Sequence, residues 1–223
     1  MKNVLAALSA AALALAAGRP GLADEKPAPP RIEIDVGEVP QLREWAEKAR
    51  GRCEKWYPRI SEILGGGGRP PRKVTLVFKR NMKGIAGTSG DRIAISGDWV
   101  KAHPDDFGMV IHELTHVVQG YPKYEPVWLV EGIADYVRYW HFEPDRQPRV
   151  RPKAAGYREG YGTAAAFLAW IEKTHDKEIV PKLNRALRAG TYRNGLFKEY
   201  TGKGLDELWR EFTATPPAPG RGR

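Results

Sequence analysis

Two histidines and a glutamate within one short segment are the residues of this chain best suited to chemistry. Residues 111–116 read I-H-E-L-T-H and contain the pattern H-E-x-x-H. Residues four apart on a helix lie on the same face, so His112 and His116 can both reach one metal ion. Two such imidazoles supply two corners of the tetrahedron that zinc prefers. Glu113 lies about 100° around the helix from His112, which suits a general base better than a third ligand.

A catalytic zinc site needs a third protein ligand and keeps one position open. The extended pattern that ends in a third histidine is absent, because Gln119 and Pro122 stand where it requires Gly and His. A later apolar stretch places Glu131 and Asp135 four residues apart, on one face of a predicted helix. Glu131 is the candidate ligand, and Asp135 is a candidate acceptor for the N–H of a ligand imidazole. Gly132 is expected to let the two helices approach closely, and the alternative is a glycine that the helix simply tolerates.

Each of these motifs also has a purely structural explanation, as a solvated helix face. Apolar neighbours disfavour it, because buried imidazoles and carboxylates need partners. In the first motif these neighbours are Val110, Ile111, Leu114, Val117 and Val118, and in the second they are Trp128, Ile133 and Tyr136. Pro104 and the two acids after it predict the start of a helix over 104–119, and Gly120 predicts its end.

Amide hydrolysis at such a site also needs a hydrogen-bond donor for the oxyanion. Tyr161, at the start of a predicted helix, is the candidate, and Tyr157 is held in reserve. Either tyrosine also suits a packed aromatic position. The remaining histidines, His103, His141 and His175, are interpreted as surface or capping residues and not as ligands.

The order of the elements that must position these residues is strands first and helices later. Runs with β character predict strands at 32–36, 74–78, 84–87 and 92–95. Segments with helical spacing follow at 104–119, 126–141, 160–174, 176–189, 194–200 and 204–213. A small sheet followed by helices predicts an α+β fold.

Two further elements complete the expected architecture. A helix is predicted over 41–64, with interruptions near Gly51 and Pro58. Peptides commonly bind along an edge strand, and 92–95 is the candidate for that edge.

Composition limits the possible metal sites and partners. The chain has 223 residues, with 36 Lys and Arg against 27 Asp and Glu, and a formal charge of +9. Cys53 is the only cysteine, which excludes an intramolecular disulfide and a multi-cysteine zinc or iron–sulfur site. The arginines are scattered and lack a groove of stacking aromatic residues, so no nucleic-acid partner is expected.

The N-terminus predicts export. Lys2, an apolar run over 4–17 and small residues after it indicate a signal peptide over 1–23, cleaved after Ala17 or Ala23. The alternative is an uncleaved anchor, but the run is too short to cross a bilayer as a helix. A secreted or periplasmic protein without stable membrane insertion is expected. Its parts would be a Pro-rich leader, a catalytic domain and a disordered tail, over 24–31, 32–214 and 215–223 respectively.

Residues 112–119 and 128–138, taken together, resemble the basic secretory protein family of plants and bacteria. The resemblance extends to weaker matches around 56–60, 84–86 and 160–170, and it covers roughly residues 40–213. Members of this family are described as secreted zinc peptidases of the gluzincin kind.

The resemblance implies a ligand set, a catalytic residue and a fold. By position, His112, His116 and Glu131 would bind the metal, and Glu113 would be the catalytic acid and base. The implied fold is zincin-like, with a small N-terminal twisted sheet over the active-site helix and a helical C-terminal half.

The sequence therefore predicts a secreted zinc metallopeptidase in which Glu113 assists the attack of water on a peptide bond. Its partner would be a peptide or protein substrate, and a monomer is expected. The alternatives are a non-catalytic cell-envelope binding protein that uses its basic charge on anionic polymers, and a zinc amidase acting on cell-wall peptides. His and carboxylate ligands also admit other divalent ions.

Overall fold

The computed structural model describes residues 28–150 and 156–214. The predicted signal peptide over 1–23, the first half of the Pro-rich leader and the predicted tail over 215–223 lie outside the described residues. The described chain forms a small mixed sheet followed by helices, which confirms the α+β class. Among the described residues, no helix combines the length and the apolar character needed to cross a membrane.

Four strands form one sheet in the order β1-β2-β4-β3. They are β1 (Arg31–Asp35), β2 (Lys73–Lys79), β3 (Ala86–Ser89) and β4 (Arg92–Ser96). β2 pairs in parallel with both β1 and β4, whereas β3 pairs antiparallel with β4. The two residues between β3 and β4 include Gly90, whose φ of 58° is readily adopted only without a side chain.

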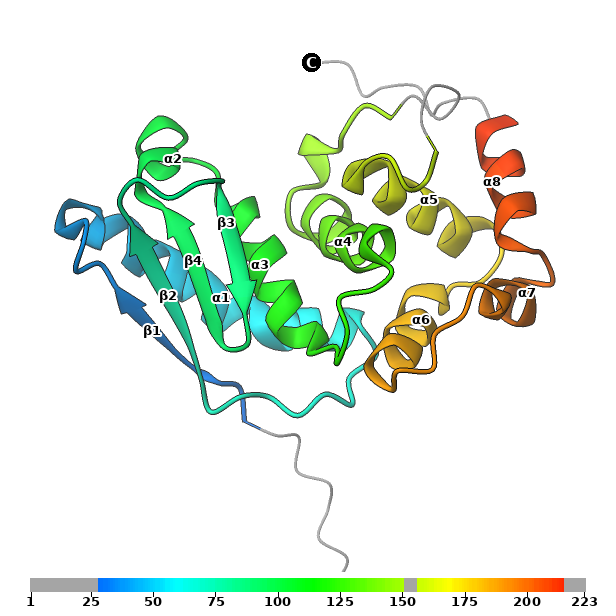
Figure 1. The fold of residues 1–223 in the computed structure, drawn as a ribbon, viewed down its shortest axis with the longest axis horizontal. Helices are drawn as coiled ribbons and strands as arrows, with labels where there is room; N and C mark the ends of the chain where they lie inside the picture. The colour runs from blue at the N-terminus through cyan, green and yellow to red at the C-terminus, as the bar shows by residue number, and fades with distance from the viewer. Residues whose placement is uncertain (1–27, 151–155, 215–223) are drawn as a thin grey trace, which may run out of the picture.

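The expectation that 92–95 forms the edge is wrong. β4 lies between β2 and β3, so β3 is the edge strand beside the helices (Figure 1). The hairpin itself is a local feature, and the sequence predicts it. Which of its strands lies at the edge depends on the parallel pairing of Thr75–Lys79 with Arg92–Ser96, a contact between distant segments.

α1 (Arg43–Ile63) is one continuous helix of 21 residues, so the predicted interruptions near Gly51 and Pro58 are wrong. Both residues are exposed, and there water can pair with the carbonyl that a proline leaves without its helical donor. The opposite face of the helix is apolar and buried, and its buried residues are Ala46, Ala49, Cys53, Tyr57 and Ile60.

The helices after the sheet are α2 (Gly97–Ala102), α3 (Gly108–Gln119), α4 (Val127–Tyr136), α5 (Tyr161–Thr174), α6 (Ile179–Arg188), α7 (Gly195–Thr201) and α8 (Leu205–Ala214). The segments that periodicity predicts are occupied by α3 to α8, whereas α2 lies outside them. Shorter turns are η1 (Pro40–Leu42), η2 (Val137–Phe142) and η3 (Pro144–Arg146). The π-helical η2 continues α4 and accounts for the long helix predicted over 126–141.

α3 begins later than the predicted start at Pro104. Asp106 is the physical reason, because its carboxylate accepts hydrogen bonds from the backbone amide of Met109 at 3.2 Å and from Arg138 at 2.8 Å. A side chain that accepts from the amide three residues on marks the position before the first helical turn. The proline and both acids therefore belong to the turn before α3.

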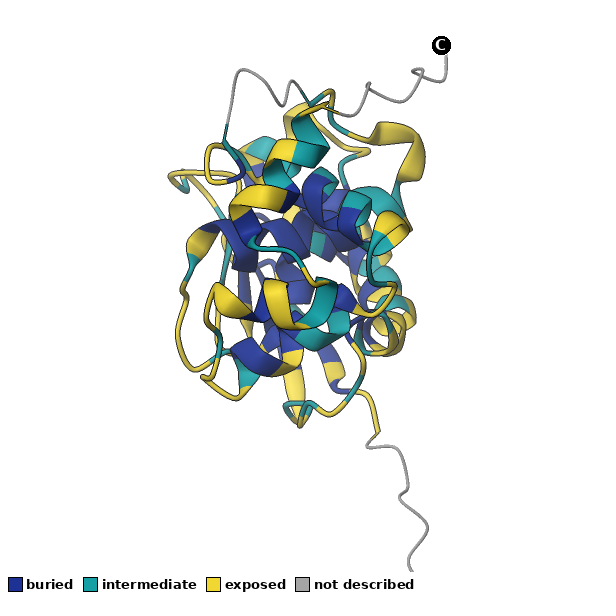
Figure 2. Ribbon diagram, turned by 90° about the vertical axis from the view of Figure 1, so that its right-hand side faces the viewer, coloured by how far each residue is buried: buried dark blue, intermediate teal, exposed yellow. Residues whose placement is uncertain are grey.

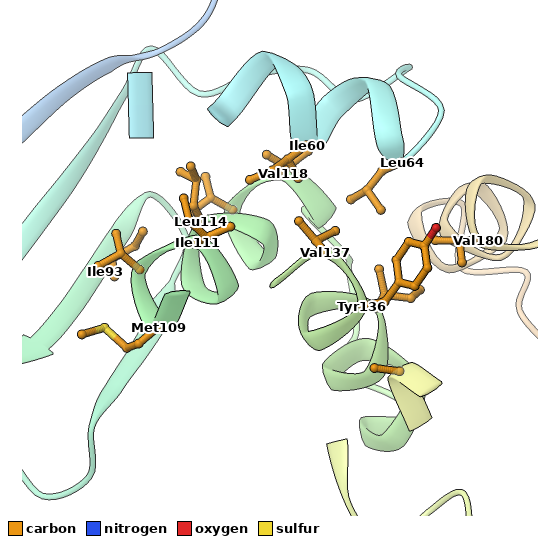
Figure 3. Close-up of a cluster of buried hydrophobic side chains, with 14 of the residues drawn as sticks. Ile60, Leu64, Ile93, Met109, Ile111, Leu114, Val118, Tyr136, Val137 and Val180 are labelled. Atoms are coloured by element: carbon orange, nitrogen blue, oxygen red, sulfur yellow. The ribbon is translucent and has the colours of Figure 1, made fainter. Parts of the chain in front are cut away.

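The core lies around α3. In Figure 1, the sheet and α1 occupy one side of the molecule, α4 to α8 occupy the other, and α3 lies between them. Buried residues fill the interior of the molecule, as Figure 2 shows. In Figure 3, Ile60 of α1, Ile93 of β4 and Leu114 of α3 belong to one apolar cluster that reaches Val137 at the end of α4. This burial holds α3 in place on both sides.

Candidate metal centre

α3 is buried along its whole length except at two residues. Of its 12 residues, only His112 and His116 are not buried. The apolar positions of this helix pack against α1, the sheet and α4, and they leave the two imidazoles on the face that remains open. The sequence thus folds so that the one accessible stripe of α3 carries both histidines of the H-E-x-x-H pattern.

α4 brings Glu131 to the same place. The Oε2 atom of Glu131 lies 3.0 Å from Nε2 of His112 and 3.7 Å from Nε2 of His116. The two Nε2 atoms are 3.2 Å apart. Among the described residues, these three side chains form the group that could hold a metal ion.

The spacing of the three ligand atoms fits zinc. Metal–ligand distances of about 2.0–2.1 Å in a tetrahedron give edges of about 3.3 Å between neighbouring ligand atoms. The three observed separations, from 3.0 to 3.7 Å, bracket that value. Two imidazoles and one carboxylate also match the donor set that zinc accepts with a fourth position open. These three residues could therefore hold a metal ion.

The outer nitrogen of each imidazole has its own acceptor. Nδ1 of His112 lies 2.8 Å from Oδ1 of Asp135, the contact that the sequence predicts. Nδ1 of His116 lies 2.8 Å from Oε1 of Gln119, whose amide nitrogen in turn donates to the carbonyl of Val130 at 2.9 Å. An Nδ1–H that donates in this way leaves the Nε2 lone pair free for a metal and fixes the orientation of the ring.

In the metal group, hydrogen bonds shift the pKa values of His112 and Glu131 in the opposite direction to burial, and the hydrogen bonds prevail. Burial alone would lower the pKa of His112, but its hydrogen bonds with Asp135 and Glu131 outweigh burial and raise that pKa. Burial would raise the pKa of Glu131, but its hydrogen bonds with His112 and His116 hold that pKa well below its usual range. Without metal, the group thus favours a protonated imidazole beside a carboxylate. A metal ion would displace that proton, as is usual when His binds a metal.

Glu113 lies on the side of α3 that faces the edge strand. Its carboxylate is only 8% exposed and accepts a hydrogen bond from the hydroxyl of Thr88 at 2.7 Å. The same hydroxyl lies 3.0 Å from the backbone carbonyl of Glu113. Thr88 belongs to β3, so a residue of the edge strand fixes the carboxylate predicted to act as the base.

Tyr124 contacts the other carboxylate oxygen of Glu131. Its hydroxyl donates to Oε1 of Glu131, and its ring lies 5.7 Å from that of His116. Since Oε2 of Glu131 faces the two histidines, Tyr124 leaves one carboxylate oxygen directed at the metal position. Tyr124 itself is half-exposed at the opening of the site.

The two tyrosines considered as oxyanion donors differ in their surroundings. Tyr161 is 48% exposed, and the charge of Glu131, together with burial and Asp135, raises its pKa. It therefore lies within electrostatic reach of the metal-ligand group. Tyr157 is 8% exposed and packs against aromatic rings, namely those of Trp128, Phe167 and Trp209, so Tyr161 is the more accessible of the two.

The remaining predictions concern residues outside the metal group. His103 stacks on Trp99 after the end of α2, and His175 follows α5. His141 is exposed within η2. An added Cβ at Gly132 would lie 2.7 Å from that of Ala164, so the close approach at this glycine is between α4 and α5, not between α3 and α4.

A family model described as "Peptidase of plants and bacteria" matches residues 43–212, which is most of the chain. The chain belongs to this family. The match confirms the resemblance to basic secretory proteins, and its span includes every residue of the metal group. No curated protein and no solved structure matches the chain.

In this member of the peptidase family, the sequence did not indicate three residues that surround the metal group. In the sequence, Gln119 stands out only as the residue that breaks the pattern with three histidines, although a polar residue three positions after His116 is a usable signal for a partner. Thr88 contacts Glu113 across 25 positions of sequence, whereas Tyr124 precedes Glu131 by only 7, and no periodic pattern in the sequence includes either residue.

Proposed function

We propose that this protein is an exported zinc metallopeptidase with a zincin-like fold. The observation that carries the proposal is the convergence of His112, His116 and Glu131 on one point, at separations that fit zinc. Membership of a family described as peptidases supports hydrolysis of peptide bonds. Zinc held by these residues would supply a Lewis acid that lowers the pKa of water to about 7.

Each residue near the site has a role in this proposal. Glu113 accepts a proton from the attacking water and delivers it to the leaving amine. Thr88 holds the carboxylate of Glu113 in place by its hydrogen bond. Tyr161 donates a hydrogen bond to the oxyanion, and its exposure leaves the hydroxyl accessible to a substrate.

The substrate is proposed to be a peptide in extended form, bound along β3. β3 is the edge strand of the sheet on the side of α3, and within the described chain it pairs with β4 alone, so the backbone groups on its other edge have no partner strand. A peptide can add to such an edge through main-chain hydrogen bonds. Thr88 lies on this strand and contacts Glu113, so a peptide bound there would lie beside the proposed base.

The proposal is tested by removing and restoring the metal. The purified protein should cleave unfolded casein, lose this activity after dialysis against a chelator, and regain it when zinc is added back. Activity that persists in the metal-free protein would contradict zinc dependence, and an inert protein with zinc bound would contradict the peptidase function.

A further inference from the structure

A cavity of about 390 Å³ opens at the start of α4, the helix that carries Glu131, on the helical side of the molecule. It is lined by Pro126, Val127, Trp128, Arg158, Tyr161 and Asn194. These residues come from the first turn of α4, the segment that enters α5, and the residue before α7. The volume is in the range of pockets that hold a small ligand or a side chain.

The cavity lies beside the proposed reaction site. Val127 precedes Glu131 by four residues on α4, so the two are one turn apart on the same face of the helix. That rise is about 6 Å, and a bound extended peptide advances about 3.3 Å per residue. Tyr161 borders the cavity and also lies within electrostatic reach of Glu131. Along α4, the wall of the cavity at Val127 is therefore offset from Glu131 by about the length of two substrate residues.

The charge of the cavity is positive. Arg158 is exposed, and its guanidinium lies over the ring of Tyr157 at 5.1 Å. In the described part of the chain no ion pair engages this guanidinium, and none of the six lining residues is acidic. An arginine of this kind is available for a bidentate contact with a carboxylate.

A second polar group in the cavity can donate hydrogen bonds. The side-chain oxygen of Asn194 accepts from the hydroxyl of Tyr192 at 2.9 Å, which leaves the amide N–H groups of Asn194 available. Pro126, Val127 and Trp128 form an apolar wall that suits the methylene groups of a side chain. A cation, an amide donor and an apolar wall together match a group that carries a carboxylate on an aliphatic stem.

We propose that this cavity is a specificity subsite that binds a substrate carboxylate next to the scissile bond. The inference rests on the proposed peptidase function. The carboxylate would come from a glutamate or aspartate side chain or from the C-terminus of the substrate. Both sources have the same chemistry, and the experiment below separates them.

The test uses peptides that differ only in charge. A set of otherwise identical peptides carries Glu, Gln or Lys at each position near the cleaved bond, and each peptide is made with a free C-terminal acid and with a C-terminal amide. The wild type should cleave one carboxylate-bearing peptide with a kcat/KM at least about tenfold above that of its uncharged partner. Preference for Glu over Gln assigns a side chain, whereas preference for the free acid over the amide assigns the C-terminus.

Substitution of Arg158 decides whether the cavity causes this preference. Arg158→Glu should remove the preference, and Arg158→Gln, which keeps most of the side-chain length, should also abolish it. Arg59→Glu is the matched control, because Arg59 is exposed, lies over the ring of Trp56 at 5.4 Å and belongs to α1, which contributes no residue to the lining of the cavity. It makes the same change of charge and should leave the preference intact.

Three results would overturn the inference: a wild type that cleaves peptides without regard to their carboxylates, Arg158 variants that retain the preference, or loss of the preference in Arg59→Glu. Failure of the wild type to cleave any peptide would instead refute the proposed peptidase function. The two failures are therefore distinguishable in one set of assays.

Discussion

α3 and α4 are both buried along almost their whole length, but each is open at a different place. In α3 the residues that are not buried are His112 and His116, in the middle of the helix. In α4 the nine residues after Val127 are buried, and only Val127, at 45%, is exposed. One opening is polar and carries two of the three residues that could hold a metal ion, and the other is apolar and borders a cavity. Packing elsewhere fixes both helices, so the two openings are the places where substitutions should separate chemistry from recognition.

Loss of the ligand on α4 should have the largest effect. Glu131→Ala removes the carboxylate that faces both imidazoles, and the affinity for zinc should fall by at least about 100-fold. Val127→Ala, one turn earlier on the same helix, is the control and should leave zinc affinity within about twofold. Titration with zinc in competition with a chromogenic chelator measures both. Equal zinc affinity in Glu131→Ala and the wild type would mean that α4 contributes no ligand.

The groups that orient the two histidines should differ in importance. Asp135→Asn replaces a charged acceptor at Nδ1 of His112 and should weaken zinc binding by about 10- to 100-fold. Gln119→Ala removes a neutral acceptor from His116 and should have a smaller effect in the same titration. A larger loss of zinc affinity in Gln119→Ala than in Asp135→Asn would contradict this ranking and show that the charge of the acceptor is not what matters.

The burial of Cys53 on α1, the helix that packs against α3, can be tested by the dependence of stability on pH. Burial, with a smaller contribution from Glu54, raises the pKa of Cys53 to about 12. The thiol of an unfolded chain has a pKa of about 8.5. At a pH above about 8.5, the unfolded chain therefore loses a proton that the folded chain keeps. This contribution to stability is fully present below about pH 8.5 and is lost as pH rises toward 12, by up to about 1.4 kcal/mol per pH unit.

Cys53→Ala isolates this effect. The free energy of unfolding of the wild type, minus that of Cys53→Ala, should fall between about pH 8 and about pH 11 in urea unfolding, because only the wild type loses the contribution of the thiol. Buried tyrosines titrate in both proteins and cancel in the comparison. A difference that stays constant over this range would show that Cys53 is not buried as a neutral thiol.

The contact between the edge strand and Glu113 should have the smallest effect. Thr88→Val removes the hydrogen bond to the carboxylate but keeps the side-chain shape, and kcat should fall by about two- to tenfold at unchanged zinc content. Thr88→Ser should restore most of the rate. Steady-state kinetics on one peptide checks both variants, and an unchanged kcat in Thr88→Val would remove Thr88 from the account.

The difference between the two helices also shows what the sequence can predict. Residues of one helix follow from spacing, so His112 and His116 could be identified from their four-residue separation, and α3 to α8 from periodicity. Glu131 could be suggested because it shares a face with Asp135, but its position against α3 follows only from packing. Most of what the sequence predicts correctly therefore depends on the spacing of residues within a single element.

The features that the sequence does not predict depend mostly on packing between segments that are distant in the sequence. The edge position of β3 depends on how β4 pairs with β2, and the continuity of α1 through Pro58 depends on the burial of its opposite face. Thr88 reaches Glu113 across 25 positions of sequence, and no periodicity marks such a contact. The cavity near Val127 is formed by three helix starts and is equally invisible in the sequence.

The central claim is that Glu113 acts on a substrate beside a metal held by His112, His116 and Glu131. The most direct test compares wild type and Glu113→Gln from parallel preparations, with zinc content and peptide cleavage measured on the same samples. Both proteins should contain about one zinc per chain, and cleavage by Glu113→Gln should be at least about 100-fold slower. Cleavage by Glu113→Gln at the wild-type rate, or a wild type that cleaves without bound metal, would contradict the account.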